Sequence, residues 1–314
     1  MKAAALTSFG GPEVLALMDV PIPQAGPGQV RVRVRSAGVN HFDTAIRQGW
    51  APPSVDTSFP LIPGNEFAGV IDQVGEGVTG NTLGDEVLGF CILGGYAEYV
   101  VVSPKQLVPK PENLAWDIAG GFAVNGIGAH LCLSEVRVAR GDTVLIHAAA
   151  GALGTFAVQL ALAWGAATVI GTASEANHAY LRSIGAVPVT YGADMSDQVR
   201  SVAPGGVDAV MDNAGGDALR ASVELVKDKN RIRTMIDDEI AAELGIPTLA
   251  PKRSSEQLET VAELYARGKI KLHIRQAFPL AEAAAAHRSI ETGHGRGKIV
   301  LLISHAGLER GEDS

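Results

Sequence analysis

A short turn of small residues carries the clearest chemical signal of this chain. Gly151 would let a phosphate approach the backbone, and Gly154 would let a following helix lie close to the preceding strand. A helix that begins here also offers unpaired N–H groups and the positive end of its dipole to an anion. We therefore expect the turn to bind the pyrophosphate of a dinucleotide through the run Ala149, Ala150, Gly151, Ala152, Leu153 and Gly154, in which Ala149 takes the place of the first glycine of G-x-G-x-x-G.

The elements on either side of this turn must position it. The β-branched, apolar run 143–146 predicts a buried strand, and the residues after the turn predict a helix that reaches about Trp164 and ends at Gly165. The fingerprint requires this strand–turn–helix context. A tight turn that binds no cofactor is the alternative.

Composition limits the classes of protein to consider. A length of 314 residues predicts two domains, and a net charge of −8 disfavours nucleic acid or an anionic membrane as the main partner. We find no apolar run long enough to span a bilayer and no secretory signal, so we expect a cytoplasmic protein that acts on a small molecule. Cys91 and Cys132 are too few for a disulfide framework or a metal cluster, and we expect them to be buried apolar residues.

The two parts of the chain show different periodicities. The first third is β-rich, with predicted strands at 29–39, 67–75 and 98–102. From about Asn113, helical segments alternate with short strands, which predicts a parallel sheet built from right-handed crossovers. The expected elements are strands at 143–146, 167–170, 187–190, 209–211 and 298–303, a helix capped by Ser254 that runs to about Arg267, and a helix at 280–291.

Several motifs together resemble the medium-chain dehydrogenase/reductases, in the zinc-free branch of quinone oxidoreductases and enoyl reductases. They are GPEVL (11–15), GPGQVRVRV (26–34), AGVNHFDTAIRQG (37–49), PGNEFAGVI (63–71), GDEVLGF (84–90), GGYAEYVVV (94–102) and GRGKIVLL (295–302). The resemblance implies an α/β protein with a β-rich, GroES-like catalytic domain at 1–115 and 275–314. It also implies a Rossmann dinucleotide-binding domain, a doubly wound parallel sheet, at 116–274, an active site where the domains meet, and a homodimer.

The resemblance also bears on zinc. Zinc members of the family place a cysteine and a histidine where this chain has Asn40 and Asn65, and a catalytic zinc needs about three protein ligands. We therefore expect no metal. Without a Lewis acid, hydride addition to a conjugated alkene or a quinone is favoured, because the negative charge spreads into an enolate or hydroquinone.

Several residues within or beside these motifs are candidates for contact with the substrate. Asn40 is expected to orient the substrate or bond its oxyanion, with the capping of a turn as the alternative. An apolar substrate pocket is expected from Phe42, Trp50 and Phe90, for each of which an ordinary core role is equally open. Asp43 and Arg47 have the spacing of an i,i+4 ion pair, and Tyr96 is a conceivable proton donor for which we favour a structural role.

Cofactor preference depends on the residues at the ends of the later strands. No acid follows the second strand of the cofactor domain, which favours NADPH, with Ser174 expected to bond the 2′-phosphate and Tyr191 to lie at the adenosine end. NADH is the alternative, since Glu175 could replace the missing acid. Asn213 fits a loop beside the cofactor, and Lys298 is expected to touch it, with an exposed lysine before an edge strand as the alternative.

The resulting hypothesis is a zinc-free oxidoreductase that transfers hydride from NADPH to an enone, an enoyl compound or a quinone. The rival is a non-catalytic dinucleotide-binding sensor or interaction protein on the same fold. Gly128, where the family usually has threonine, and the altered stretch 228–238 favour that rival.

Overall fold

Alternating valine and arginine build the central strand of the first sheet. In β3 (Val30–Val39) the valines at 30, 32 and 34 are buried and the residues between them are half-buried. One edge of β3 pairs with β4 (Glu66–Val74). The other edge pairs with β6 (Tyr99–Val102) at residues 30–33 and with β14 (Lys298–Leu302) at residues 36–39. β14, the last strand within the described residues, is thereby bonded to the end of β3.

The computed structural model describes residues 1–249, 252–293 and 295–305 and divides the chain into two units. The first unit comprises Met1–Val124 and Ile274–Ser314. Its seven-stranded sheet has the order β13-β14-β3-β4-β5-β7, with β6 on β3, and β1 and β2 form a separate pair. Its further elements are β1 (Lys2–Ala5), β2 (Ala16–Asp19), β5 (Glu86–Phe90), β7 (Leu107–Pro109), β13 (Ile274–Pro279), α1 (His41–Arg47), α2 (Trp116–Ala119) and α10 (Ala283–Glu291).

The second unit, Asn125–His273, contains a parallel sheet of five strands in the order β10-β9-β8-β11-β12. The chain builds outward from β8 to β10 and then returns to β11, so the direction of winding changes between β8 and β11. In a doubly wound sheet, ligands bind outside the carboxyl ends of the strands at this switch point. The strands are β8 (Thr143–Ile146), β9 (Thr168–Ala173), β10 (Val187–Thr190), β11 (Ala209–Asp212) and β12 (Ile232–Thr234).

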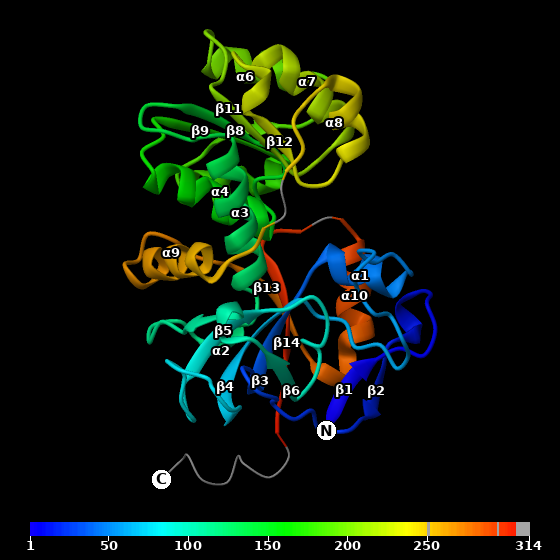
Figure 1. Ribbon diagram of the computed structural model, residues 1–314. Helices are drawn as coiled ribbons and strands as arrows, with labels where there is room; N and C mark the ends of the chain where they lie inside the picture. The colour runs from blue at the N-terminus through cyan, green and yellow to red at the C-terminus, as the bar shows by residue number, and fades with distance from the viewer. Residues whose placement is uncertain (250–251, 294, 306–314) are drawn as a thin grey trace. The chain divides into compact units, whose positions relative to one another are not determined.

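Helices cover both faces of the second sheet (Figure 1): α6, α7 and α8 gather on one face, and α3 and α4 lie on the other. Buried Leu145, Ile170 and Val210 of three adjacent strands join one apolar core. The helices are α3 (Ala123–Glu135), which begins in the first unit, α4 (Ala152–Ala163), α5 (His178–Ser183), α6 (Met195–Val202), α7 (Gly216–Leu225), α8 (Asp238–Leu244) and α9 (Ser255–Ala266). No helix within the described ranges is long and apolar enough to cross a membrane.

The predicted fold class is confirmed, as are most of the predicted elements. Strands β8 and β10 have the predicted bounds, and Ser254 caps α9 with Gln257 in a reciprocal capping box. β9 extends to Ala173 because it pairs with both neighbours beyond residue 170. Both cysteines are buried. Residues 306–314 of the predicted segment 275–314 lie outside the described residues.

Candidate active site

The turn after β8 has the backbone geometry that the sequence predicts. Gly154 must be a glycine, because a Cβ there would lie 2.6 Å from the carbonyl oxygen of Ala148 and from Cα of Ala149. Gly151 is the N-cap of α4, and a Cβ there would meet only one atom, the oxygen of Ala148, at 3.4 Å. The start of α4 is therefore packed closely against the backbone of residues 148 and 149, and it has room at its N-cap.

A buried histidine holds the turn to its neighbours, and sequence analysis missed it. His147 has no exposed area; its Nδ1 lies 3.2 Å from Oγ1 of Thr172, and its Nε2 lies 2.9 Å from Oγ of Ser222. Ser222 donates to the oxygen of Ala218, so its oxygen accepts from Nε2–H. Burial lowers the pKa of His147 to about 4. A polar residue directly after an apolar strand is the signal that could have found it.

Asn213 lies beside this histidine at the end of β11. Its Nδ2 donates to the backbone oxygen of His147 over 3.0 Å, whereas its buried Oδ1 has no partner among the described residues. The neighbouring carboxylate of Asp212 is buried and accepts hydrogen bonds from the Gly215 N–H and from Oγ1 of Thr234. Asn213 therefore presents an acceptor at the carboxyl ends of the strands, where the turn 149–154 also lies.

Ser174 and Tyr191 directly follow two strands that run side by side. Ala173, the last residue of β9, is in register with Thr190, the last residue of β10. The two residues predicted to bind adenosine therefore follow the carboxyl ends of neighbouring strands, at adjacent positions. Ser174 accepts a hydrogen bond from Nδ2 of Asn177, and Tyr191 is 56% exposed.

In the first unit, the sheet brings together a buried ion pair. Nζ of Lys298 lies 2.7 Å from Oε1 of Glu66, and neither side chain is more than 2% exposed. The same ammonium donates to the oxygen of Val39 over 2.9 Å and to Oδ1 of Asn40 over 2.5 Å. Its three hydrogens therefore have three protein acceptors. The alternative of an exposed lysine before an edge strand is wrong, because β14 lies between β13 and β3.

Asn40 extends this ion pair to a second asparagine. Nδ2 of Asn40 donates to Oε1 of Glu66 and to Oδ1 of Asn65, each over 2.8 Å. Oε2 of Glu66 accepts from the backbone N–H of Val124. Asn65 has no exposed area, and its Nδ2 has no hydrogen-bond partner among the residues that the structure describes. Asn40, Asn65, Glu66 and Lys298 are called the amide network below.

A second buried cluster borders the amide network through the backbone of Asn40. Oδ2 of Asp43 accepts from the Asn40 N–H over 2.8 Å and from the Tyr96 hydroxyl over 3.1 Å, and that hydroxyl lies 3.2 Å from Nε2 of His287. Burial raises the pKa of Asp43 to about 7, raises that of Tyr96 well above its usual value and lowers that of His287 to about 3. This placement accords with the structural role favoured for Tyr96.

The ion pair expected between Asp43 and Arg47 does not form among the described residues. Asp43 turns to the N-cap of α1, where it completes a capping box with Asn40. Arg47 instead pairs with Glu291 at the end of α10. Helical spacing made the pair possible, but tertiary packing supplied a different partner for each side chain.

The predicted pocket aromatics differ in exposure. Phe42 and Trp50 pack edge to face with ring centroids 5.9 Å apart, and Trp50 is 56% exposed. Phe90 ends β5 and is 8% exposed. An ordinary core role therefore fits Phe90 and does not fit Trp50.

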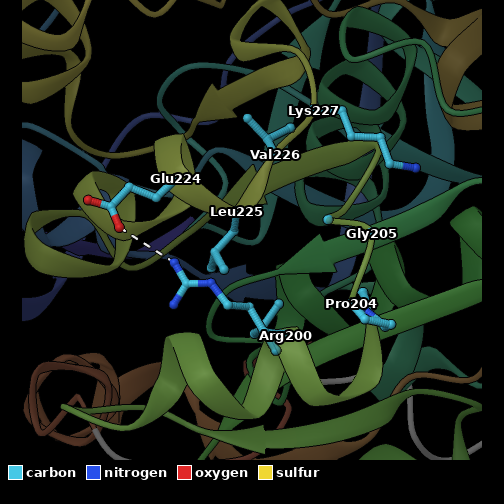
Figure 2. A pocket seen from close by; sticks show the side chains of 10 residues that line it. Arg200, Pro204, Gly205, Glu224, Leu225, Val226 and Lys227 are labelled. Atoms are coloured by element: carbon cyan, nitrogen blue, oxygen red, sulfur yellow. Dashed lines mark ion pairs between the residues drawn. The ribbon is translucent and has the colours of Figure 1, made fainter.

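A hollow of about 260 Å³ lies elsewhere in the second unit, and none of the predicted site residues line it. Figure 2 shows Arg200 of α6 facing Glu224 of α7 across it, with the ion pair at 3.6 Å. The lining segment 203–206 precedes β11, so the hollow is at the amino ends of the strands, opposite the turn at residues 149–154.

The amide network does not fit a zinc ion. Its nitrogens are amides and an ammonium, which are not zinc ligands, and Glu66 is the one side chain of the set that could bind the metal. Across the described ranges, no group of three or more histidine, cysteine, aspartate or glutamate side chains could hold a metal ion.

Comparison with known proteins gives two family matches. Residues 26–112 match the alcohol dehydrogenase GroES-like domain, and residues 184–301 match the family described as zinc-binding dehydrogenase. A 2-haloacrylate reductase of a Burkholderia species is 33% identical over 96% of this chain and 99% of its own length. The rat synaptic vesicle membrane protein VAT-1 homolog is 37% identical over 74% of this chain, and the match spans 59% of that protein.

Solved structures resemble the whole chain. The Escherichia coli quinone oxidoreductase complexed with NADPH superposes with a TM-score of 0.84. It is 25% identical, and the alignment covers 96% of this chain and all of that one.

Proposed function

Since this chain belongs to the medium-chain dehydrogenase/reductase family of oxidoreductases, in its quinone oxidoreductase-like branch, we propose that it transfers hydride from NADPH to a conjugated enone, an enoyl compound or a quinone. The 2-haloacrylate reductase among its relatives is named for a substrate with a conjugated C=C bond, and other relatives are named for quinones. Both acceptors take a hydride on carbon and place the negative charge on oxygen.

The observation that carries this proposal is the turn at residues 149–154, at the switch point of the parallel sheet. Gly154 allows the helix to approach, and Gly151 leaves its N-terminal N–H groups open to a pyrophosphate. The unpartnered Oδ1 of Asn213 adds an acceptor for an amide or hydroxyl hydrogen. A reduced nicotinamide dinucleotide bound there supplies the hydride.

Ser174 and Tyr191 support the preference for NADPH. The hydroxyl of Ser174 can donate to a 2′-phosphate, and the exposed Tyr191 offers a ring and a hydroxyl beside it. Glu175, which is exposed at the same turn, is the residue that would favour NADH instead.

In the first unit we assign Asn40 and Lys298 to positioning. Both amide hydrogens of Asn40 are directed to protein acceptors, and Lys298 has an acceptor for each of its three hydrogens. We therefore propose that Lys298 acts as a structural cation and not as a contact of the dinucleotide. Phe42 and Trp50, which pack against each other, are proposed to contact an apolar part of the substrate.

The test is a binding titration followed by an activity panel. NADPH and NADH binding are measured by nucleotide fluorescence, and dinucleotide oxidation is then followed with enones, enoyl thioesters and quinones. Tight NADPH binding with turnover of at least one acceptor class supports the proposal. A folded protein that binds dinucleotide but oxidises it with none of them favours the non-catalytic alternative.

Gly128 is the observation that favours that alternative, and it can be tested directly. A Cβ at Gly128 would lie 3.2 Å from Cδ1 of Leu153 and 3.6 Å from Cε of Met235, so a threonine fits after a small side-chain shift. In a competent reductase, Gly128→Thr changes turnover modestly. Turnover that exists only in Gly128→Thr identifies the natural chain as a binding protein.

A further inference from the structure

Hydrogen-bond chemistry fixes which end of each amide in the network is which. An ammonium only donates, so the Asn40 atom beside Lys298 must be Oδ1. Nδ2 of Asn40 therefore faces Glu66, whose carboxylate accepts, and Asn65. The Asn65 atom that meets Nδ2 must in turn be Oδ1, so the other end of Asn65 is its NH₂ group.

Asn65, in this orientation, has a side-chain donor without a partner among the described residues. Both amides are oriented by one buried cation, and the series runs from Lys298 through Asn40 to Nδ2 of Asn65, which has no partner among the described residues. Each hydrogen bond in such a series polarises the next one, so the last N–H is a stronger donor than an isolated amide. The Nδ2–H of Asn65 therefore lacks only a hydrogen-bond acceptor.

We propose that Nδ2 of Asn65 is the hydrogen-bond donor for the carbonyl oxygen of the acceptor substrate. This rests on the proposed function. When hydride adds to the β-carbon of an enone, the electron pair of the C=C bond shifts and the negative charge appears on the carbonyl oxygen. The Asn65 N–H holds this charge, and a proton from solvent then completes the saturated product, while the dinucleotide is oxidised.

The burial of Asn65 suits this role. A donor held away from water gives a stronger hydrogen bond to a developing charge and needs no reorganisation when the charge appears. The side chain has no exposed area, so its N–H is shielded from water.

Two substitutions separate donation from packing. Asn65→Leu keeps the approximate volume and removes the donor, whereas Asn65→Asp keeps the acceptor for Asn40 and replaces the donor by a carboxylate. Ser36→Ala is the matched control, because Ser36 is equally buried in the same sheet and donates to the oxygen of Trp116, outside the amide network. Turnover, Michaelis constant and unfolding midpoint are measured for all three.

We expect Asn65→Leu to lower kcat by about 100-fold, as removal of an oxyanion donor does, while its unfolding midpoint falls no further than that of Ser36→Ala. Asn65→Asp should regain activity as the pH falls, because a protonated carboxyl group donates again. That pH profile would be absent from the natural protein and from Ser36→Ala.

A second measurement is independent of turnover. In a complex with oxidised dinucleotide and a ¹³C-carbonyl enone, infrared spectroscopy should show a lowered carbonyl stretching frequency in the natural protein and not in Asn65→Leu. An active natural protein whose Asn65 variants keep its kcat and its carbonyl frequency overturns the inference alone. A natural protein that turns over no acceptor overturns the proposed function.

Discussion

Lys298 and Glu66 form an ion pair with Nζ and Oε1 2.7 Å apart, although the two residues come from strands that do not pair with each other. β3 lies between β14 and β4, and the two side chains meet with at most 2% of either exposed. Glu66 and Lys298 bond the two ends of the Asn40 amide, so the pair fixes how the amide network is oriented.

Replacing Lys298 by methionine should destabilise the protein strongly. Lys298→Met leaves the buried carboxylate of Glu66 without its cation, and loss of one partner of a buried pair costs about 3–5 kcal/mol. Lys227→Met is the matched control, because Lys227 pairs with Asp208 at the surface, where the expected loss is below about 1 kcal/mol. Chemical denaturation measures both free energies of unfolding.

The double variant checks the cause of that loss. Glu66→Gln combined with Lys298→Met removes both charges and should recover part of the stability. A Lys298→Met protein as stable as Lys227→Met would contradict the assignment of Lys298 as a structural cation.

A carboxylate at Gly151 should block the dinucleotide without harming the helix. Gly151 has the extended backbone of an N-cap, where aspartate stabilises a helix relative to glycine by a few tenths of a kcal/mol. The same carboxylate would repel a pyrophosphate, and a repulsion of about 3 kcal/mol weakens binding by more than 100-fold. Gly151→Asn caps the helix without charge and is the control. NADPH titration and thermal unfolding of both variants provide the comparison; equal affinities would place the pyrophosphate elsewhere.

Ser174 should decide between the two dinucleotides. Ser174→Asp places a carboxylate at the end of β9, where it accepts from both ribose hydroxyls of NADH and repels the 2′-phosphate of NADPH. The dissociation constant for NADPH should rise by about 10- to 100-fold, and NADH should bind more tightly. Ser174→Ala loses a single hydrogen bond, so its NADPH affinity should fall about fivefold. An unchanged preference in Ser174→Asp would remove Ser174 from the adenosine site.

Asp43 should give the protein a stability that decreases with rising pH. Its pKa is about 7 in the folded protein and near 3.8 when unfolded, so between these values the folded state keeps a proton that the unfolded state has lost. The stabilisation is complete below pH 3.8 and is lost as the pH rises through 7. Relative to the natural protein, Asp43→Asn should gain up to about 1.4 kcal/mol per pH unit across this window.

Urea denaturation between pH 5 and 8 measures this difference. His147 and His287, whose pKa values burial lowers to about 4 and about 3, act in the opposite direction, because below pH 6.5 only their unfolded forms take up protons. Both histidines are present in both proteins, so their effect cancels in the comparison. Parallel stability curves for Asp43→Asn and the natural protein would show that Asp43 is ionised when folded.

Local sequence pattern predicted the first strand, turn and helix of the parallel sheet well. The strand 143–146, the small-residue turn and the helix to residue 163 follow from short-range preferences, since each depends on neighbours within a few positions. Ser254 and Gln257 cap α9 for the same reason. These features could be read from the sequence because their determining contacts lie within one turn of chain.

Long-range contacts decided the rest. Lys298 and Asn40 are 258 positions apart, and only the pairing of β14 with β3 brings them together and makes Lys298 a buried cation. Asp43 and Arg47 were correctly placed on one helix, but their partners Tyr96 and Glu291 come from elsewhere in the chain. The sequence by itself determined which residues form strands, turns and helices and hence the family. The tertiary structure decided which polar groups share the interior, because burial and partnership depend on distance in space and not on distance along the chain.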